Sequence, residues 1–222
     1  MNNNSKNILN EFQVPWRQQL IFITMALMLI GLFTSRALLS VSMILFVAVT
    51  CFHSNFFHQL KDFIVSPFLF AMAFLFLIPL ISGLWSDDLQ EWAAIIRIKL
   101  PLLFLPVAFV GKWQLSRKQW NQIAWLFVML VFANCCWSIF HYMQNARSFN
   151  EGYLRAKSIL TPLKDDHVRF SWLVSVAVII CFVLLEHTSK LFRSIAWTFI
   201  LTFAVYLHIL AARTGLISLY IT

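Results

Sequence analysis

Residues 170–186 read FSWLVSVAVIICFVLLE, and no charged residue precedes Glu186 in this stretch. The stretch approaches the roughly 20 apolar residues with which an α-helix crosses a bilayer. Its apolar residues run continuously rather than alternating with polar ones, which favours a helix over a half-buried β-strand. We therefore predict a membrane-spanning helix here, and similar runs on both sides of it decide the fold class.

Further apolar runs place helices along most of the chain. We predict about seven complete spans, near residues 18–35, 37–53, 63–84, 98–112, 119–142, 170–186 and 194–212, and residues 214–222 would begin a truncated eighth. Pro101 and Pro106 interrupt the fourth helix, which is expected to kink or to lie partly in the membrane interface. The predicted fold is an all-α, polytopic transmembrane bundle without internal repeats.

Composition supports a membrane protein. Of 222 residues, 60% are hydrophobic and 12% are charged, about half the charged fraction of a soluble domain. The net charge of +8 is spread over loops, so lipid headgroups are expected partners and nucleic acid is not. The four cysteines lie in or near apolar runs and predict no disulfide framework. The polar N-terminus lacks a signal-peptide pattern, so the first apolar run is expected to be retained as a helix.

The predicted organisation is a cytoplasmic tail over residues 1–17 and a transmembrane domain over 18–222, with outer loops near 85–97 and 143–169. Basic residues divide almost evenly between the two sides, so their total does not decide the orientation. When the N-terminus is placed inside, the outer cations concentrate in the two longer loops together with acidic residues. The positive-inside rule is weaker in such loops. This distribution favours a cytoplasmic N-terminus.

Arg213 is an unusual residue because it lies in the apolar stretch LHILAARTGLISLYI, residues 207–221. The predicted topology places it at the outer membrane face. It could extend to lipid phosphates, as arginines at helix ends do. Alternatively, Thr214 and Gly215 would allow a ligand or another helix to approach the backbone closely. Tyr206 lies on roughly the same helix face.

Arg97 and Lys99 form a second basic pair, in EWAAIIRIKLPLLFLPVAF. Residues two apart on a helix point in divergent directions. One of the two could therefore face a ligand while the other meets lipid headgroups, or both could be interfacial.

A third group of polar residues precedes the helix at 170–186: Lys164, Asp165, Asp166, His167 and Arg169. One hypothesis is that this group serves proton transfer or phosphate binding, with His167 and Asp166 as candidate catalytic residues. The other hypothesis is a solvated helix start that Asp165 or Asp166 caps. The sequence shows no metal-ligand spacing, no phosphate-binding glycine loop and no nucleophile elbow, and we predict no metal and no cofactor.

Three stretches together resemble the bacterial O-antigen ligase and O-antigen polymerase superfamily of membrane glycosyltransferases. SGLWSDDLQEWAAIIRIKLPLLFLPVAF at 82–109 is similar to the family's Ser-x-x-Trp-Ser segment and the helix after it, and DDHVRFSWLVSVAVII at 165–180 to a histidine-containing helix start. LHILAARTGLISLYI at 207–221 is similar to the arginine junction that opens the C-terminal homology region, with Ala212 where serine is common.

The resemblance implies transfer of a glycan from undecaprenyl diphosphate to lipid A core, or to a growing chain in polymerases, at the periplasmic face of the bacterial inner membrane. Arg213 matches the diphosphate-binding arginine, and Arg97, Lys99 and Arg169 are weaker candidates. Family members continue into a large periplasmic loop with a functional histidine. We therefore expect this chain to be a fragment that resembles the N-terminal half, with the catalytic base in the other half.

Other functions stay open at this point. A polysaccharide polymerase would use the same donor chemistry as a ligase. A transporter subunit would need polar residues at mid-membrane depth, and the predicted helices hold almost none apart from Asn134. A scaffold subunit without catalytic activity would tolerate loss of Arg213.

Overall fold

The computed structural model describes residues 15–52, 56–111, 115–144, 161, 166–186, 190–210 and 220. Every regular element within these ranges is a helix, which confirms the all-α prediction. The chain divides into two compact units, Met1–Ser116 and Arg117–Thr222. We describe each unit separately.

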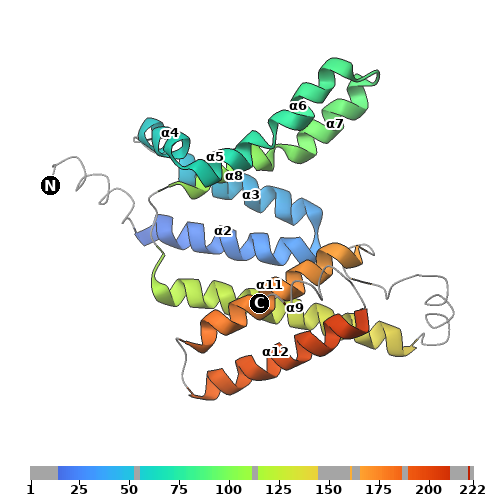
Figure 1. The fold of residues 1–222 in the computed structure, drawn as a ribbon. Helices are drawn as coiled ribbons and strands as arrows, with labels where there is room; N and C mark the ends of the chain where they lie inside the picture. The colour runs from blue at the N-terminus through green and yellow to red at the C-terminus, as the bar shows by residue number, and fades with distance from the viewer. Residues whose placement is uncertain are drawn as a thin grey trace. The chain divides into compact units, whose positions relative to one another are not determined.

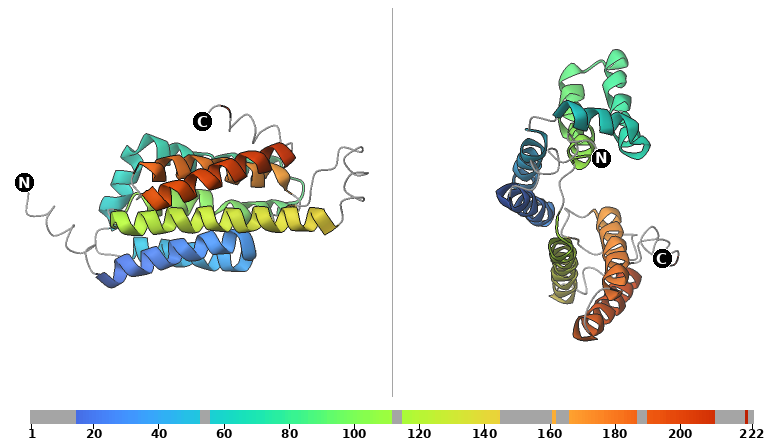
Figure 2. Two further views of the ribbon diagram at one scale, coloured as in Figure 1. Left: turned by 90° about the horizontal axis from the view of Figure 1, so that it is seen from below. Right: turned by 90° about the vertical axis from the view of Figure 1, so that its left-hand side faces the viewer.

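The first unit begins with an antiparallel helical hairpin. Helix α2 (Pro15–Thr34) and helix α3 (Arg36–Cys51) lie side by side along their lengths (Figures 1 and 2). Gly31 allows this close packing, because a Cβ atom at that position would lie 2.6 Å from the backbone nitrogen of Leu39. The two helices therefore approach each other at Gly31 more closely than any larger residue would permit.

Arg17 joins the open end of this hairpin. Its Nη2 atom donates hydrogen bonds to the carbonyl oxygens of Val49, at 3.0 Å, and Phe52, at 2.9 Å. These carbonyls belong to the end of α3, where the last turn of a helix lacks its own donors and carries partial negative charge. Although it is a cation, Arg17 is only 8% exposed, and these bonds compensate its burial.

The chain then forms helix α4 (Phe56–Val65), helix α5 (Pro67–Phe74), helix α6 (Leu77–Ser82) and a 3-10 turn, η1 (Gly83–Trp85). The sequence predicted one helix over 63–84, whereas the structure breaks it at Ser66. Pro67 explains the break, since proline fits the first turn of a helix but disfavours helical backbone at the residue before it. Pro67–Trp85 remains long and apolar enough to span a membrane.

Helix α7 (Leu89–Lys99) and helix α8 (Pro101–Phe109) follow. The predicted outer loop near 85–97 is thus helical from Leu89 onward. Asp88 caps α7, with its Oδ1 atom accepting from the backbone N–H groups of Gln90, at 2.8 Å, and Glu91, at 3.1 Å. In the tertiary arrangement α7 packs against α6, and α8 packs against α3 and α5.

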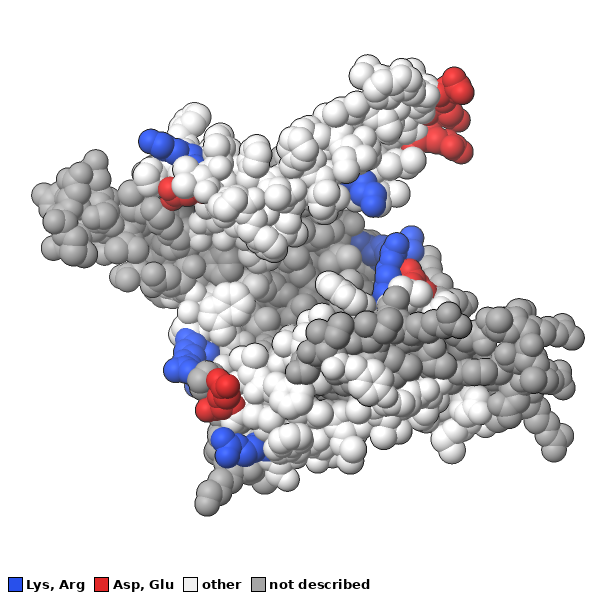
Figure 3. Space-filling model, in the orientation of Figure 1, with Lys and Arg blue, Asp and Glu red and all other residues white. Residues whose placement is uncertain are grey.

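Helices α6 and α7 form a hairpin whose connecting turn carries acidic side chains (Figure 3). The Nε1 atom of Trp92 donates to the carbonyl oxygen of Pro79, at 2.9 Å, and joins the two helices. A Cβ atom on Gly83 would overlap the indole ring of Trp92. Glycine is therefore required for this ring to pack against the hairpin.

The second unit consists of helix α9 (Arg117–Gln144), helix α11 (His167–Leu185) and helix α12 (Lys190–Leu210), which pack against one another (Figure 2). Small residues lie in its core, where Cys135, Ala177 and Ala196 are fully buried. The hydroxyl of Tyr206 donates a hydrogen bond to that of Ser138 at 3.0 Å. Small residues let membrane helices approach closely, and polar pairs join them.

Six of the described helical segments are long and apolar enough to cross a bilayer, or seven if the bent pair α3 and α4 forms one span. The protein is therefore a helical membrane protein. The count of seven complete spans and a truncated eighth stays a prediction. Apart from Tyr220, the proposed eighth segment lies outside the described residues.

Candidate functional site

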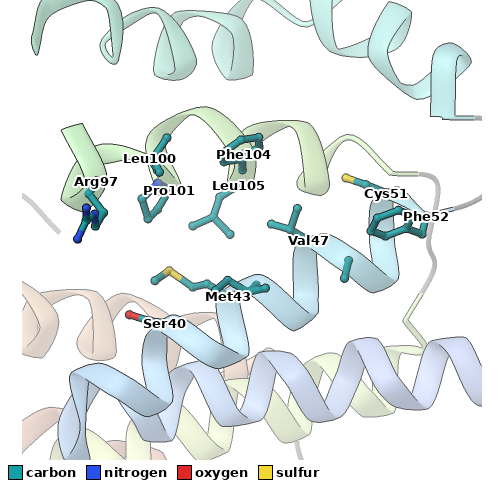
Figure 4. Close-up of a pocket in the computed structure, with 12 residues that line it drawn as sticks. Ser40, Met43, Val47, Cys51, Phe52, Arg97, Leu100, Pro101, Phe104 and Leu105 are labelled. Atoms are coloured by element: carbon teal, nitrogen blue, oxygen red, sulfur yellow. The ribbon is translucent and has the colours of Figure 1, made fainter. Parts of the chain in front are cut away.

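The first unit contains an open groove of about 580 Å³ between α3 and the α7–α8 segment (Figure 4). Binding pockets for small molecules commonly have volumes of about 300–1,000 Å³. Side chains of α3 form one wall, and those of Leu100, Pro101, Phe104 and Leu105 form the other. The lining is almost entirely apolar, so the groove suits a hydrocarbon chain.

The wall from α3 follows from helical periodicity. Its lining residues, Ser40, Met43, Ile44, Val47, Ala48, Cys51 and Phe52, recur at intervals of three and four, which places them on one face of the helix. From Ser40 to Cys51 this face extends about 17 Å at the usual helical rise. One leaflet of a hydrocarbon core is about 15 Å thick, so the groove is long enough to accompany a lipid chain through one leaflet.

Arg97 lies at the Ser40 end of the groove, and Cys51 and Phe52 lie at the other end (Figure 4). The side chain of Arg97 is exposed. Within the described part of the chain, its guanidinium forms no hydrogen bond or ion pair. The groove therefore combines apolar walls with an exposed cation at one end, an arrangement that complements a lipid carrying an anionic headgroup.

Arg36 is not among the lining residues, but it begins α3 one helical turn before Ser40, which does line the groove. Its side chain is exposed. Arg36 was not predicted as a site residue. Its spacing of four residues from Ser40 is a sequence signal that could have linked it to the face of α3 that lines the groove.

The structure separates the two cations of α7. Arg97 lines the groove, whereas Lys99 is exposed and is not among the lining residues. Helical geometry explains the difference, because residues two apart point in divergent directions. Lys99 is consequently a matched control for Arg97, since it offers a cation on the same helix at nearly the same depth.

The candidate residues of the second unit form a helix start. Asp166 precedes α11 and accepts from the backbone N–H of Arg169 at 3.0 Å. Its other carboxylate oxygen pairs with Nε of Arg169 at 2.9 Å. His167 is the first residue of the helix. The capping interpretation of Asp166 is thus confirmed, and its carboxylate and Arg169 are engaged with each other.

Arg213, Lys164 and Asp165 lie outside the described residues. On either side of Arg213 in the sequence, His208 and Tyr220 are described, and their side chains form a hydrogen bond of 3.0 Å between Nε2 and the hydroxyl. The assignment of Arg213 therefore rests on the sequence. Among the residues that the structure does describe, no cluster of three metal-ligating side chains occurs.

The comparisons with known proteins add no family. No protein-family model, no curated protein and no solved structure matches this chain.

Proposed function

We propose that this protein binds a lipid-linked phosphate or diphosphate in the groove between α3 and α7–α8, and that it serves in glycan transfer from undecaprenyl diphosphate to lipid A core or a related acceptor. The observation that carries the proposal is the exposed Arg97 at the end of an apolar groove. The resemblance to O-antigen ligases supports the identity of the lipid, and the proposed location is the bacterial inner membrane with a periplasmic active face.

Two features of the groove support an amphiphilic ligand. The apolar walls favour a hydrocarbon chain that would otherwise lie among lipid tails, and they offer few polar groups to a soluble metabolite. At the Ser40 end, the guanidinium of Arg97 can donate two parallel hydrogen bonds to phosphate oxygens.

The chemistry of the proposed reaction requires such cations. An acceptor hydroxyl attacks the anomeric carbon of the donor, the bond from that carbon to the diphosphate oxygen breaks, and the hydroxyl proton passes to a base. The diphosphate gains negative charge as the bond breaks, so fixed guanidinium groups stabilise the transition state. In this scheme Arg97 holds the lipid-linked phosphate at the end of the groove, and Arg213 is the diphosphate-binding residue that the resemblance implies. His167 stays a candidate for the base on the sequence alone.

Binding of undecaprenyl phosphate to the purified protein in nanodiscs tests the groove directly. Native mass spectrometry would count the bound lipid for the unaltered protein and for Arg97→Ala, Arg97→Lys and Lys99→Ala. A charge-assisted hydrogen bond contributes about 1.5–3 kcal/mol, so Arg97→Ala should weaken binding by roughly tenfold or more. Arg97→Lys should retain part of the affinity, and Lys99→Ala should bind as the unaltered protein does.

A second variant tests the hydrocarbon end. Ala48→Trp would place a large ring in the groove and should reduce binding without removing any charge. Equal losses from Arg97→Ala and Lys99→Ala would show general attraction to the cationic surface and would refute the groove. The transfer step is tested separately, by incubating the protein with undecaprenyl diphosphate-linked glycan and lipid A core and following the glycan into the acceptor.

A further inference from the structure

Helix α4 lies at the end of the first unit where α2 begins (Figure 1). The hydrogen bonds from Arg17 to Val49 and Phe52 fix the end of α3 beside the start of α2. Because α2 is a candidate span that starts at Trp16, this end of the hairpin lies at one bilayer surface. The axis of α4 is bent by 105° from that of α3, an angle that directs α4 along this surface.

One face of α4 is fixed to the rest of the unit. Gln59 is 5% exposed, and its Nε2 atom donates to the carbonyl oxygen of Val107 in α8 at 2.7 Å. Phe63, one turn later, is 7% exposed, and its ring lies 5.9 Å from that of Phe70 in α5. These contacts determine the rotation of α4 about its own axis, and hence which residues face outward.

The outward face combines large apolar residues with a cation. Phe57 is 83% exposed and Ile64 is 61% exposed, and the exposed Lys61 lies between them. The spacing of four and then three residues places all three on one face of the helix. A helix that lies in the membrane interface carries this combination, with apolar side chains at the acyl boundary and the ammonium group of lysine at the phosphates.

We propose that α4 is a membrane-surface helix whose partner is the phospholipid headgroup layer. Phe57 and Ile64 insert at the boundary between headgroups and acyl chains, and Lys61 binds lipid phosphates. The neighbouring acid is Asp62, whose Oδ2 atom lies 3.8 Å from Nε2 of His58. This contact holds the carboxylate away from the face that carries Phe57 and Ile64. This surface is distinct from the groove and does not depend on glycan transfer.

Depth-dependent quenching tests the proposal on the full-length chain. A polarity-sensitive fluorescent amino acid would be introduced in place of Phe57, Ile64 or, as the control on the side of the helix, Asp62. In nanodiscs containing lipids brominated near the headgroup, the probes at positions 57 and 64 should emit at shorter wavelength and be quenched more strongly than the probe at 62. Lys61→Glu should reduce the quenching at both positions, whereas Lys61→Arg should preserve it.

Two results would overturn the proposal. Quenching of the probes at 57 and 64 by aqueous iodide but not by brominated lipid would show that the outer face of α4 is in water. Protection from both quenchers, together with crosslinking at position 57, would show that a protein surface covers it. Lys61 is exposed, so an unchanged melting temperature of the Lys61 variants would establish that the altered quenching reports lipid contact instead of unfolding.

Discussion

Replacing Gly31 with alanine is the sharpest test of the first helical hairpin. The added Cβ atom would lie 2.6 Å from the backbone nitrogen of Leu39 and 2.8 Å from its Cα. These are backbone atoms, which no side-chain rotation can move. Helices α2 and α3 must therefore separate by most of an ångström before the contact reaches the ordinary 3.4 Å.

Two effects of opposite sign determine the size of the change. Overpacking of this kind costs about 1–3 kcal/mol, whereas alanine gains about 1 kcal/mol over glycine in a helix interior. Because the contact is with backbone, we expect the upper part of the first range and a net loss of about 1–2 kcal/mol. A loss of this size raises the equilibrium constant for unfolding roughly 5–30-fold.

The assay is reversible unfolding of the full-length chain in mixed detergent micelles, followed by circular dichroism as the denaturing detergent is increased. Ala93→Gly provides the calibration, because Ala93 is exposed on α7 and reports the difference between alanine and glycine without a close contact. If Gly31→Ala were as stable as the unaltered protein or more stable, the close approach of α2 and α3 would be refuted.

Two further contacts give predictions of the same kind. Gly83→Ala should displace the indole of Trp92 from α6, and hydrogen exchange measured by mass spectrometry should show faster exchange in α6 and α7 while the second unit keeps its protection. Tyr206→Phe leaves the buried Ser138 hydroxyl without its tyrosine partner and should destabilise the protein by about 1 kcal/mol. Ser138→Ala should cost a similar amount, and the double variant little more than either single one, as measured by the same unfolding titration.

Local signals in the sequence were sufficient for most helices. Continuous apolar runs indicated the spans, and the two carboxylates before residues 170–186 left Asp165 or Asp166 as the candidate cap, of which the structure shows Asp166. The break before Pro67 was also encoded locally, because proline disfavours helical backbone at the residue before it. It was missed because the apolar run through residues 63–84 was long enough for one span, and length was given more weight than the proline.

The early start of α7 was missed for a different reason. The stretch near 85–97 holds several charged residues and was predicted as an outer loop. Asp88 caps α7 at its start, and Leu89–Phe109 as a whole is long and apolar enough to span a membrane. The charged residues gave no information on the secondary structure of this segment.

The groove could not be predicted from the sequence at all. It exists because α3 packs against α8, and the two helices are separated by more than forty residues of chain. No local pattern specifies that pairing, so the face of α3 that includes Ser40 and Val47 looked like any other apolar helix face. Arg97 was identified as a candidate cation. Which of Arg97 and Lys99 faces the groove could be decided only from the structure.

Arg17 and Arg97 should show opposite effects, because one is enclosed by carbonyl groups and the other is exposed. Arg17→Met removes two charge-assisted hydrogen bonds to the end of α3, each contributing about 1.5–3 kcal/mol. We expect this variant to lower stability in the unfolding titration by at least about 2 kcal/mol. Arg97→Met breaks no bond to a described residue and should change stability by no more than about 0.5 kcal/mol.

Lipid binding should separate the same two variants in the reverse order. Under conditions where both remain folded, Arg97→Met should lose affinity for undecaprenyl phosphate, whereas Arg17→Met should retain it, since Arg17 does not line the groove. Loss of both stability and binding in the Arg97 variant would mean that its guanidinium supports the fold, and the groove would then lack an available cation. Retention of both would remove Arg97 from the site. A structural role for the buried arginine and a binding role for the exposed one require that Arg17→Met loses stability but not binding, and that Arg97→Met loses binding but not stability.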